Sequence, residues 1–152
     1  MRKLILLIVV FVSFQSQMKA QFYFGPEVSF LTDGDAFGVG GNTLFNVNDQ
    51  IKGSINAHYY FGGKINWDLN LDVHYQVVEI GDDTFFNAFT GLNIREEDEP
   101  MNQDDVDLGL GINFGLFFHT PITDDMRLFL EGKFSLVING SSGGGFTAGV
   151  FF

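Results

Sequence analysis

The 152-residue chain is both acidic and apolar: it has 19 Asp and Glu against 8 Lys and Arg, yet 45% of its residues are hydrophobic and only 18% are charged. Its length allows one domain, and its apolar content excludes intrinsic disorder. The absence of cysteine excludes disulfides, thiolate metal sites and thiol nucleophiles. The net charge of -11 argues against nucleic acid as a partner, because phosphate recognition needs clustered Lys and Arg.

The first twenty residues have the pattern of a secretory signal peptide. Arg2 and Lys3 precede an apolar run of nine residues, and the small Ala20 follows a more polar stretch. An uncleaved membrane anchor is the alternative, but the run is well short of the roughly 20 apolar residues that a spanning helix needs. We therefore predict a signal peptide over residues 1–20 and a mature domain over residues 21–152. Cleavage would leave 5 basic and 19 acidic residues.

Alternation of apolar and polar residues runs through the rest of the chain and predicts β-strands. The pattern is strongest over residues 65–77, where Ile65, Trp67 and every further odd position are apolar or aromatic. Phe117 is the only break in the equivalent pattern of residues 106–118. Eight strands are predicted in chain order, over residues 22–30, 37–47, 51–61, 65–77, 84–94, 106–118, 126–138 and 146–152.

The number of strands has one alternative. A six-stranded count turns residues 32–50 and 79–105 into long loops, but so small a barrel would close with difficulty, and we predict eight. Pro26 cannot donate a hydrogen bond to a neighbouring strand, so we expect a β-bulge there. With the last strand running towards the periplasm, the predicted outer loops are 32–36, 62–64, 95–105 and 139–144, and the predicted inner turns are 48–50, 79–83 and 119–125.

The two faces of these strands indicate the class of protein. Alternating strands form either a soluble barrel or sandwich with an apolar interior, or a membrane barrel whose apolar face meets lipid. A soluble barrel needs many Lys and Glu outside, whereas the polar face here is mainly Gly, Ser and Asn. The apolar face carries almost no charge over nine to thirteen residues per strand, and about 9–11 tilted residues cross a bilayer. The sequence therefore predicts an all-β, antiparallel up-and-down transmembrane β-barrel with a narrow polar lumen.

The few charged residues of the polar face have both signs, which suits a closed lumen filled by ion pairs. We interpret them as an internal charge network rather than a proton relay, because an unpaired charge in the lumen would be costly. The predicted members are Glu27, Lys52, Asp68, Asp72, Asp107, Arg127, Glu131 and Lys133.

Two segments resemble the small eight-stranded outer-membrane barrels of Gram-negative bacteria, the superfamily of the OmpA-type transmembrane domain, OmpX and the "outer membrane protein beta-barrel domain" proteins. Residues 106–133 are similar to a hairpin of that superfamily in which GxGxxF precedes a polar turn and LxxxE follows it. The resemblance covers residues 21–152. It implies an outer-membrane protein without a cofactor, and we expect a monomer that contacts lipid, lipopolysaccharide and, during insertion, the barrel-assembly machinery. The last strand resembles the signal read by that machinery, carried by Phe146, Ala148, Val150 and Phe152.

No combination of residues predicts catalysis. Ser54 and His58 on one strand would lie about 13 Å apart, beyond hydrogen-bond reach, and no G-x-S-x-G is present. We expect structural or solvated roles for His58, His74 and His119. An acidic block is a weak candidate for binding divalent cations, because carboxylates suit these ions although EF-hand spacing is missing. Its members are Glu96, Glu97, Asp98, Glu99, Asp104 and Asp105.

The function predicted from the sequence is that of a non-enzymatic outer-membrane barrel protein with a largely plugged lumen and a structural or surface-interaction role. A small passive pore or transport component is one alternative, and a conducting lumen would favour it. A secreted lipocalin-like binding barrel is the other, and solubility without detergent would favour it.

Overall fold

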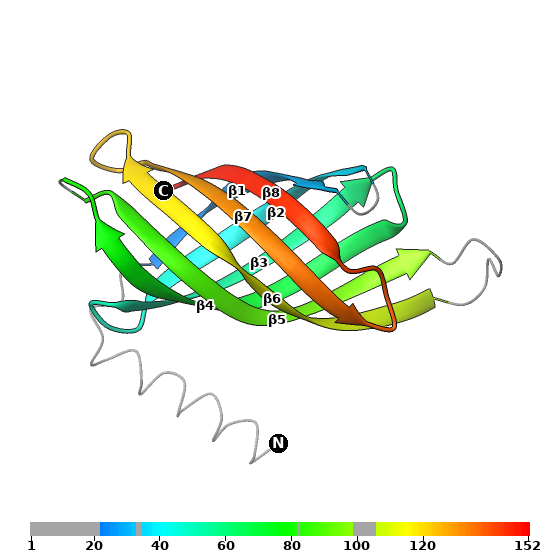
Figure 1. Ribbon diagram of the computed structural model, residues 1–152. Coiled ribbons are helices and arrows are strands. Elements are labelled where there is room, and N and C mark those ends of the chain that lie inside the picture. The colour runs from blue at the N-terminus through cyan, green and yellow to red at the C-terminus, as the bar shows by residue number, and fades with distance from the viewer. Residues whose placement is uncertain (1–21, 33–34, 82, 99–105) are drawn as a thin grey trace, which may run out of the picture.

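The computed structural model describes residues 22–32, 35–81, 83–98 and 106–152, and the predicted signal peptide lies outside these residues. Eight antiparallel strands close into one barrel, in which each strand pairs with its neighbours in sequence and β1 pairs with β8 (Figure 1). The prediction of eight strands is confirmed. The strands are β1 (Phe22–Leu31), β2 (Ala36–Asn46), β3 (Ile51–Phe61), β4 (Ile65–Glu79), β5 (Phe85–Asp98), β6 (Val106–Pro121), β7 (Arg127–Ile138) and β8 (Gly143–Phe151).

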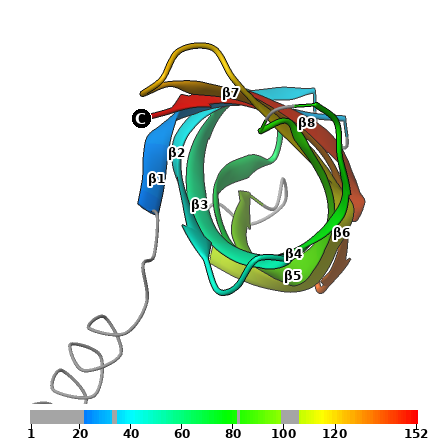
Figure 2. The same ribbon diagram turned by 90° about the vertical axis from the view of Figure 1, so that its left-hand side faces the viewer.

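The barrel has two distinct ends. We call the end where β1 begins and β8 finishes the terminal end; it is at the left in Figure 1 and faces the viewer in Figure 2, where the strands form a closed ring. The β2–β3, β4–β5 and β6–β7 connections also lie there. The opposite end, which we call the loop end, carries the other four connections. Among the described residues, no helix has the length and apolar character needed to cross a membrane.

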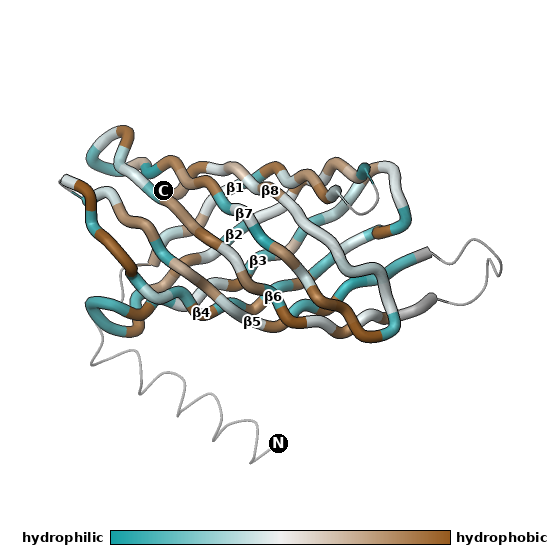
Figure 3. Tube along the Cα trace, viewed as in Figure 1, coloured by the Kyte–Doolittle hydropathy of each residue, from teal (hydrophilic) through white to brown (hydrophobic). Residues whose placement is uncertain are grey.

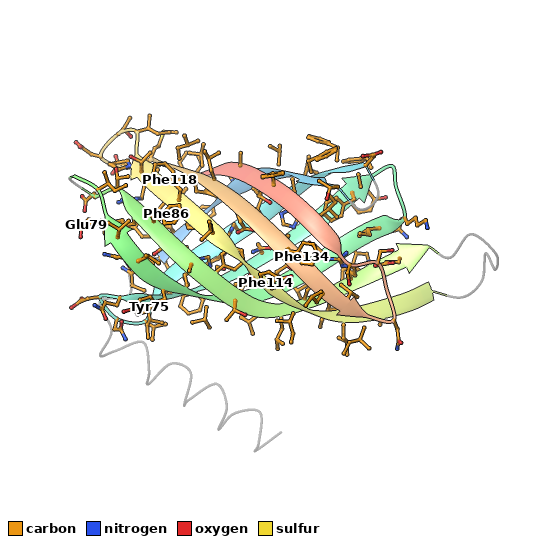
Figure 4. The ribbon with its side chains drawn as sticks, viewed as in Figure 1. Tyr75, Glu79, Phe86, Phe114, Phe118 and Phe134 are labelled. Carbon is orange, nitrogen blue, oxygen red and sulfur yellow. The ribbon has the colours of Figure 1, made fainter. Side chains whose placement is uncertain are left out.

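Exposure alternates along each strand and shows which face looks outward. On β4, Leu69 and Leu71 are 41% and 50% exposed, whereas Asp68 and Asn70 are 1% and 0% exposed. The same alternation of apolar and polar residues is visible along the trace in Figure 3. The apolar face of the strands is therefore the outside of the barrel, and the polar face lines its interior. Aromatic side chains of this outer surface near the terminal end include Tyr75, Phe86 and Phe118 (Figure 4).

The strict alternation that we predicted for residues 65–77 is wrong at its first residue. The pairing of β4 with β5 shifts register between Ile65 and Trp67, and again between Gln76 and Val78. Such an irregularity reverses which residues of the strand face inward and which face outward. Ile65 is consequently 3% exposed and points inward, while the next apolar residues point outward.

Several strands are longer than the sequence pattern indicated, and the extensions of β5 and β6 place further polar residues in the lumen. β5 continues to Asp98, so Arg95 and Glu97 lie in a strand rather than in the predicted loop over residues 95–105. β6 continues to Pro121, so His119 lies in a strand rather than in the predicted inner turn. All three side chains are at inward positions and are at most 8% exposed. The alternation missed them because charged residues at a strand end resemble a polar loop.

The bulge expected at Pro26 is absent. β1 pairs with β2 in unbroken register from Phe22 to Leu31, through Pro26 opposite Gly41. On its other side the ladder with β8 covers only five pairs, from Glu27 opposite Gly149 onward. A single backbone bond from Phe152 N–H to the Phe24 carbonyl resumes the same register beyond the proline. The missing donor of Pro26 is therefore accommodated by an interrupted ladder at the β1–β8 seam.

Glycines on the inner face make room for large side chains of neighbouring strands. A Cβ at Gly115 would collide with the Gly132 carbonyl oxygen and would lie 2.7 Å from the Phe89 ring. Gly132, on the outer face of β7, is different, since the nearest atom to a Cβ there is 3.8 Å away in Phe146. The interior is thus filled to contact at Gly115, whereas the outer surface is open at Gly132.

We predict that Gly115→Ala destabilises the barrel by about 1–3 kcal/mol, because the added methyl overpacks a filled interior. The matched control Gly132→Ala, on the outer face of the neighbouring strand β7, should change the stability by less than about 0.5 kcal/mol. Urea unfolding of the refolded protein in detergent would measure both variants. Equal stabilities of the two variants would contradict the close packing at Gly115.

Candidate functional site

The lumen is the natural candidate for a functional site, and its terminal end is closed by an apolar plug. Tyr23 and Leu44 are paired residues close to this end, and Phe151 is the last strand residue of β8. The Phe129 and Phe151 rings stack with their centroids 4.3 Å apart, and the Phe117 ring lies 5.5 Å from that of Phe129. We call this cluster the aromatic plug; its buried members are Leu44, Phe89, Phe117, Phe129 and Phe151, with Tyr23 packed against them.

Two cations lie beside the aromatic plug at the terminal end. Lys52 Nζ lies 4.5 Å from the centroid of the Phe85 ring, and the Arg127 guanidinium lies 5.7 Å from the same centroid. Arg127 also donates to His119 Nδ1 over 3.2 Å and to the backbone carbonyl of Asp83. Aromatic faces and neutral acceptors therefore hold these two charges.

The middle of the lumen is crossed by a layer of asparagine amides. Asn70 Oδ1 accepts hydrogen bonds from Asn93 Nδ2 over 2.6 Å and from Asn113 Nδ2 over 2.7 Å. Asn70 Nδ2 donates to Asn56 Oδ1 over 2.7 Å. Ser135 Oγ extends the layer by donating to Asn113 Oδ1. These residues come from five consecutive strands and are at most 1% exposed, so this amide layer fills the lumen with paired polar groups.

An ionic cluster lies on the loop-end side of the amide layer and centres on His58. Its Nδ1 lies 2.7 Å from Asp68 Oδ1, and its Nε2 lies 2.9 Å from Glu27 Oε1. Asp68 Oδ2 also accepts a hydrogen bond from the Tyr60 hydroxyl and lies 3.5 Å from Lys133 Nζ. All five side chains are at most 6% exposed. The His58 ring, which belongs to β3, thus joins Asp68 of neighbouring β4 to Glu27 of β1, which lies beyond β2.

The loop end is closed in two different ways. On the side of β1 to β4 a second apolar cluster, the apolar cap, consists of Leu31, Ala36, Tyr60 and Ile65. On the other side Arg95 and Glu97 of β5 hold the backbone of Ser141 in the β7–β8 turn. Apolar contacts, amides, ion pairs and a turn thus follow one another along the lumen.

The charged residues predicted for the lumen lie in several groups rather than in one network. Glu27, Asp68 and Lys133 meet around His58. Asp72 instead joins the amide layer, where it accepts from Asn56 and Asn113 over 3.4 and 3.2 Å. Lys52 and Arg127 lie at the terminal end, Glu131 is 4% exposed, and the side chain of Asp107 lies outside the part of the chain that the structure describes.

Sequence analysis missed His58, Arg95 and Glu97 as members of the ionic interior. The alternation places His58 on the polar face of its strand, which is a usable signal. Its two partners are 31 and 10 residues away along the chain, however, and only the strand register brings them to one ring. Arg95 and Glu97 gave no such signal because Arg95 directly precedes the acidic block and Glu97 belongs to it.

The described members of the acidic block point in different directions. Glu96 lies on the outer side of β5, where it accepts hydrogen bonds from the Trp67 indole and from Asn66. Glu97 points inward to the Ser141 backbone. Asp98 is described only in its backbone, and Glu99, Asp104 and Asp105 lie outside the described residues. Among the described residues, no group of three or more His, Asp and Glu side chains is arranged to hold a metal ion.

The four residues of the predicted assembly signal share the outer face of the last strand. Phe146 and Phe152 are 66% and 53% exposed. Ala148 and Val150 lie between them at the same alternate positions, and each is partly exposed. These side chains form a continuous apolar row on the outside of the barrel, along β8 and the residue after it.

We predict that His58→Leu lowers the free energy of unfolding by about 3–5 kcal/mol, because Glu27 and Asp68 lose the imidazole that lies between their buried carboxylates. Adding Glu27→Gln to this variant should restore part of the loss, since one buried carboxylate is removed. A double-mutant cycle from urea unfolding in detergent measures the coupling. Additive effects of the two substitutions would contradict the bridge.

Comparisons with known proteins address the fold. No family model matches the sequence, and no curated protein matches it. The N-terminal β-barrel domain of OprF from Pseudomonas aeruginosa is similar in structure, with 13% sequence identity and a TM-score of 0.72 over 89% of this chain and 97% of that one. Neisserial surface protein A (NspA) gives 15% identity and a TM-score of 0.58, covering 88% and 98% of the two chains.

The attachment invasion locus protein Ail of Yersinia pestis is a third similar structure, with 9% identity and a TM-score of 0.57 over 87% of this chain and 95% of that one. All three are small outer-membrane barrels. Each alignment spans nearly the whole of both chains, so the likeness concerns the complete barrel. The chain therefore has the fold of the small eight-stranded outer-membrane β-barrels, as the resemblance in its sequence implied.

Proposed function

We propose that this chain is an outer-membrane protein of a Gram-negative bacterium, exported by its signal peptide, and that it has a structural or surface-interaction role rather than a transport role. One observation carries the proposal: the outside of the barrel is apolar, while its lumen is filled from end to end by the aromatic plug, the amide layer, the ionic cluster and the loop-end closures. An apolar exterior needs lipid, and a filled lumen leaves the outer surface and loops as the places where partners bind.

The filled lumen speaks against both alternatives. A passive pore needs a continuous aqueous path, which the aromatic plug and the apolar cap interrupt at the two ends of this barrel. A lipocalin-like binder needs an internal cavity and a polar exterior. Here Phe24 and Leu92 are 65% and 60% exposed, while Asn113 and Asp68 are buried. The exposure of these residues therefore favours a membrane barrel over a secreted binding barrel.

The partners that suit this surface are lipids and, during insertion, the barrel-assembly machinery, which we propose reads the apolar side chains of β8. We propose lipopolysaccharide as the lipid at the loop end and a monomeric state. Ail has been crystallised with the heparin analogue sucrose octasulfate. The net charge of -11 and the acidic residues after Arg95 disfavour direct binding of a sulfated polyanion to this chain, and lipopolysaccharide phosphates at the loop end would contact these carboxylates through divalent cations.

A catalytic role has little support in the geometry. His58, the histidine with the strongest carboxylate contacts, is 3% exposed and has both ring nitrogens directed at side chains of the protein itself. A general base needs access to the proton that it removes. We therefore propose that His58 stabilises the fold and that the protein is not an enzyme.

We predict that the mature chain, refolded in detergent, migrates faster on a gel when unboiled than when boiled, because a closed barrel resists unfolding by the detergent. The boiled sample is the control. The single tryptophan, Trp67, offers a second readout because it lies near the outer surface. Brominated lipids should quench its fluorescence after reconstitution. A chain that shows no gel shift and remains soluble without detergent would overturn the membrane assignment.

We predict further that the refolded barrel gives no stable single-channel conductance in a planar bilayer, because polar and apolar side chains block the lumen. The matched variant combines Phe117→Ala and Phe129→Ala, which removes two rings of the aromatic plug. It serves as a measure of how far the plug alone limits conduction. Large, steady openings of the unaltered protein would favour the passive pore instead.

A further inference from the structure

Side chains of β5 hold the β7–β8 turn at the loop end by binding its backbone. The Ser141 N–H lies 2.9 and 3.0 Å from the two carboxylate oxygens of Glu97, to which it donates. The Ser141 carbonyl accepts a hydrogen bond from Arg95 over 3.1 Å. Arg95 and Glu97 thus grip the donor and the acceptor of a single residue, with charge-assisted hydrogen bonds on both sides.

This grip requires the turn to fold into the barrel. Arg95 and Glu97 belong to β5, whereas the turn follows β7, and β6 stands between these strands. Pairing of β6 with β7 ends at Leu110 opposite Ile138, and the turn after Ile138 is no longer paired with β6. A Cβ at inward-facing Gly109 would lie 2.7 Å from the Val137 side chain, 3.4 Å from the Arg95 side chain and 3.8 Å from the Asn139 carbonyl. Val137, Arg95 and the start of the turn therefore lie together over the inner face of β6 at Gly109.

The turn contributes no apolar anchor of its own. Its sequence, from Asn139 to Ser142, is Asn-Gly-Ser-Ser, and three glycines follow. Asn139, Gly140 and Ser142 are exposed, and only Ser141 is partly buried. A Cβ at Gly140 would lie 2.8 Å from the Glu97 carboxylate, so this carboxylate also supports the neighbouring residue. Within its own hairpin the turn has the bond from the Val137 N–H to Ser142 Oγ, and Arg95 and Glu97 supply its hydrogen bonds to another strand. A segment held by few contacts opens locally at low cost.

We propose that the β7–β8 turn is a releasable cork for the half of the loop end formed by β5 to β8. Release of the Ser141 backbone exposes the polar interior beneath it, including Ser135, to the outside. The apolar cap keeps the other half closed, and the aromatic plug keeps the terminal end closed. The interior then opens to the outside at one end only, as far as the amide layer.

Cysteine labelling tests the cork, and the absence of natural cysteines makes the background clean. Ser135→Cys places a thiol beneath the turn, and Ser54→Cys places one in the terminal half; each parent serine is 1% exposed. Ser141→Pro is the variant meant to release the turn. It removes the N–H that donates to Glu97 and leaves every lumen charge in place. A small charged methanethiosulfonate reagent is added to the refolded barrel in detergent.

We expect Ser141→Pro to accelerate labelling at position 135 by about ten- to a hundredfold, the range that corresponds to losing one hydrogen bond to a charged group. Labelling at position 54 should stay slow in both backgrounds. Equal rates at position 135 with and without Ser141→Pro overturn the cork. Faster labelling at both positions also overturns it, because it shows a general loosening of the barrel.

Two further variants test whether the effect comes from the bond between Ser141 and Glu97. Glu97→Gln keeps one acceptor but loses the charge, so it should accelerate labelling at position 135 less than Ser141→Pro does, and it replaces that variant if the proline prevents folding. Ser142→Ala is the control in the same turn, because Ser142 Oγ binds the Val137 N–H and does not contact Glu97. A Ser142→Ala effect as large as that of Ser141→Pro would contradict the specific grip. The gel-mobility shift reports separately whether each variant forms a barrel.

Discussion

Closure of the sheet is the constraint on which the rest of this structure depends. Every strand has a partner on both sides, and β1 completes the ring with β8. Hydrocarbon offers no partner to a backbone N–H or C=O, so a strand that faces it must find both in its neighbours. Eight strands enclose an interior just wide enough for side chains. Closure therefore decides both that the outside can be apolar and that the inside must be packed.

The narrow interior in turn explains its chemistry. Polar groups removed from water need partners, and in a barrel these partners come from strands that are distant in sequence. Asn70 and Asn113, separated by 43 residues, share one hydrogen bond, and Thr147 donates to Ser29 from 118 residues away. The first bond joins β4 to β6 past β5, and the second joins β8 to β1 at the closure of the ring. The polar interior thus acts as a core, with hydrogen bonds in the place of much of the apolar packing.

Period-two alternation was sufficient to predict the strands and their faces, because each side chain of a strand alternates sides regardless of its neighbours. It failed where register matters. The inward position of Ile65 follows from an irregularity in pairing with β5, which one strand alone does not reveal. The aromatic plug was hidden for another reason: Phe129 and Phe151 are apolar residues on the polar face, and a plug becomes visible only when rings from several strands meet. The same holds for the partners of His58.

The β1–β8 seam gives the barrel a mechanical weak line. β8 shares five residue pairs with β1 but nine with β7, and β5 shares fourteen with β6. Beside Pro26 the ladder is interrupted, and Gly149 offers no side chain there to reinforce it. Force applied to the C-terminus would therefore part β8 from β1 before β8 leaves β7. The ring would open into a curved sheet along this line, with the tall wall of β4, β5 and β6 as the last part to come apart.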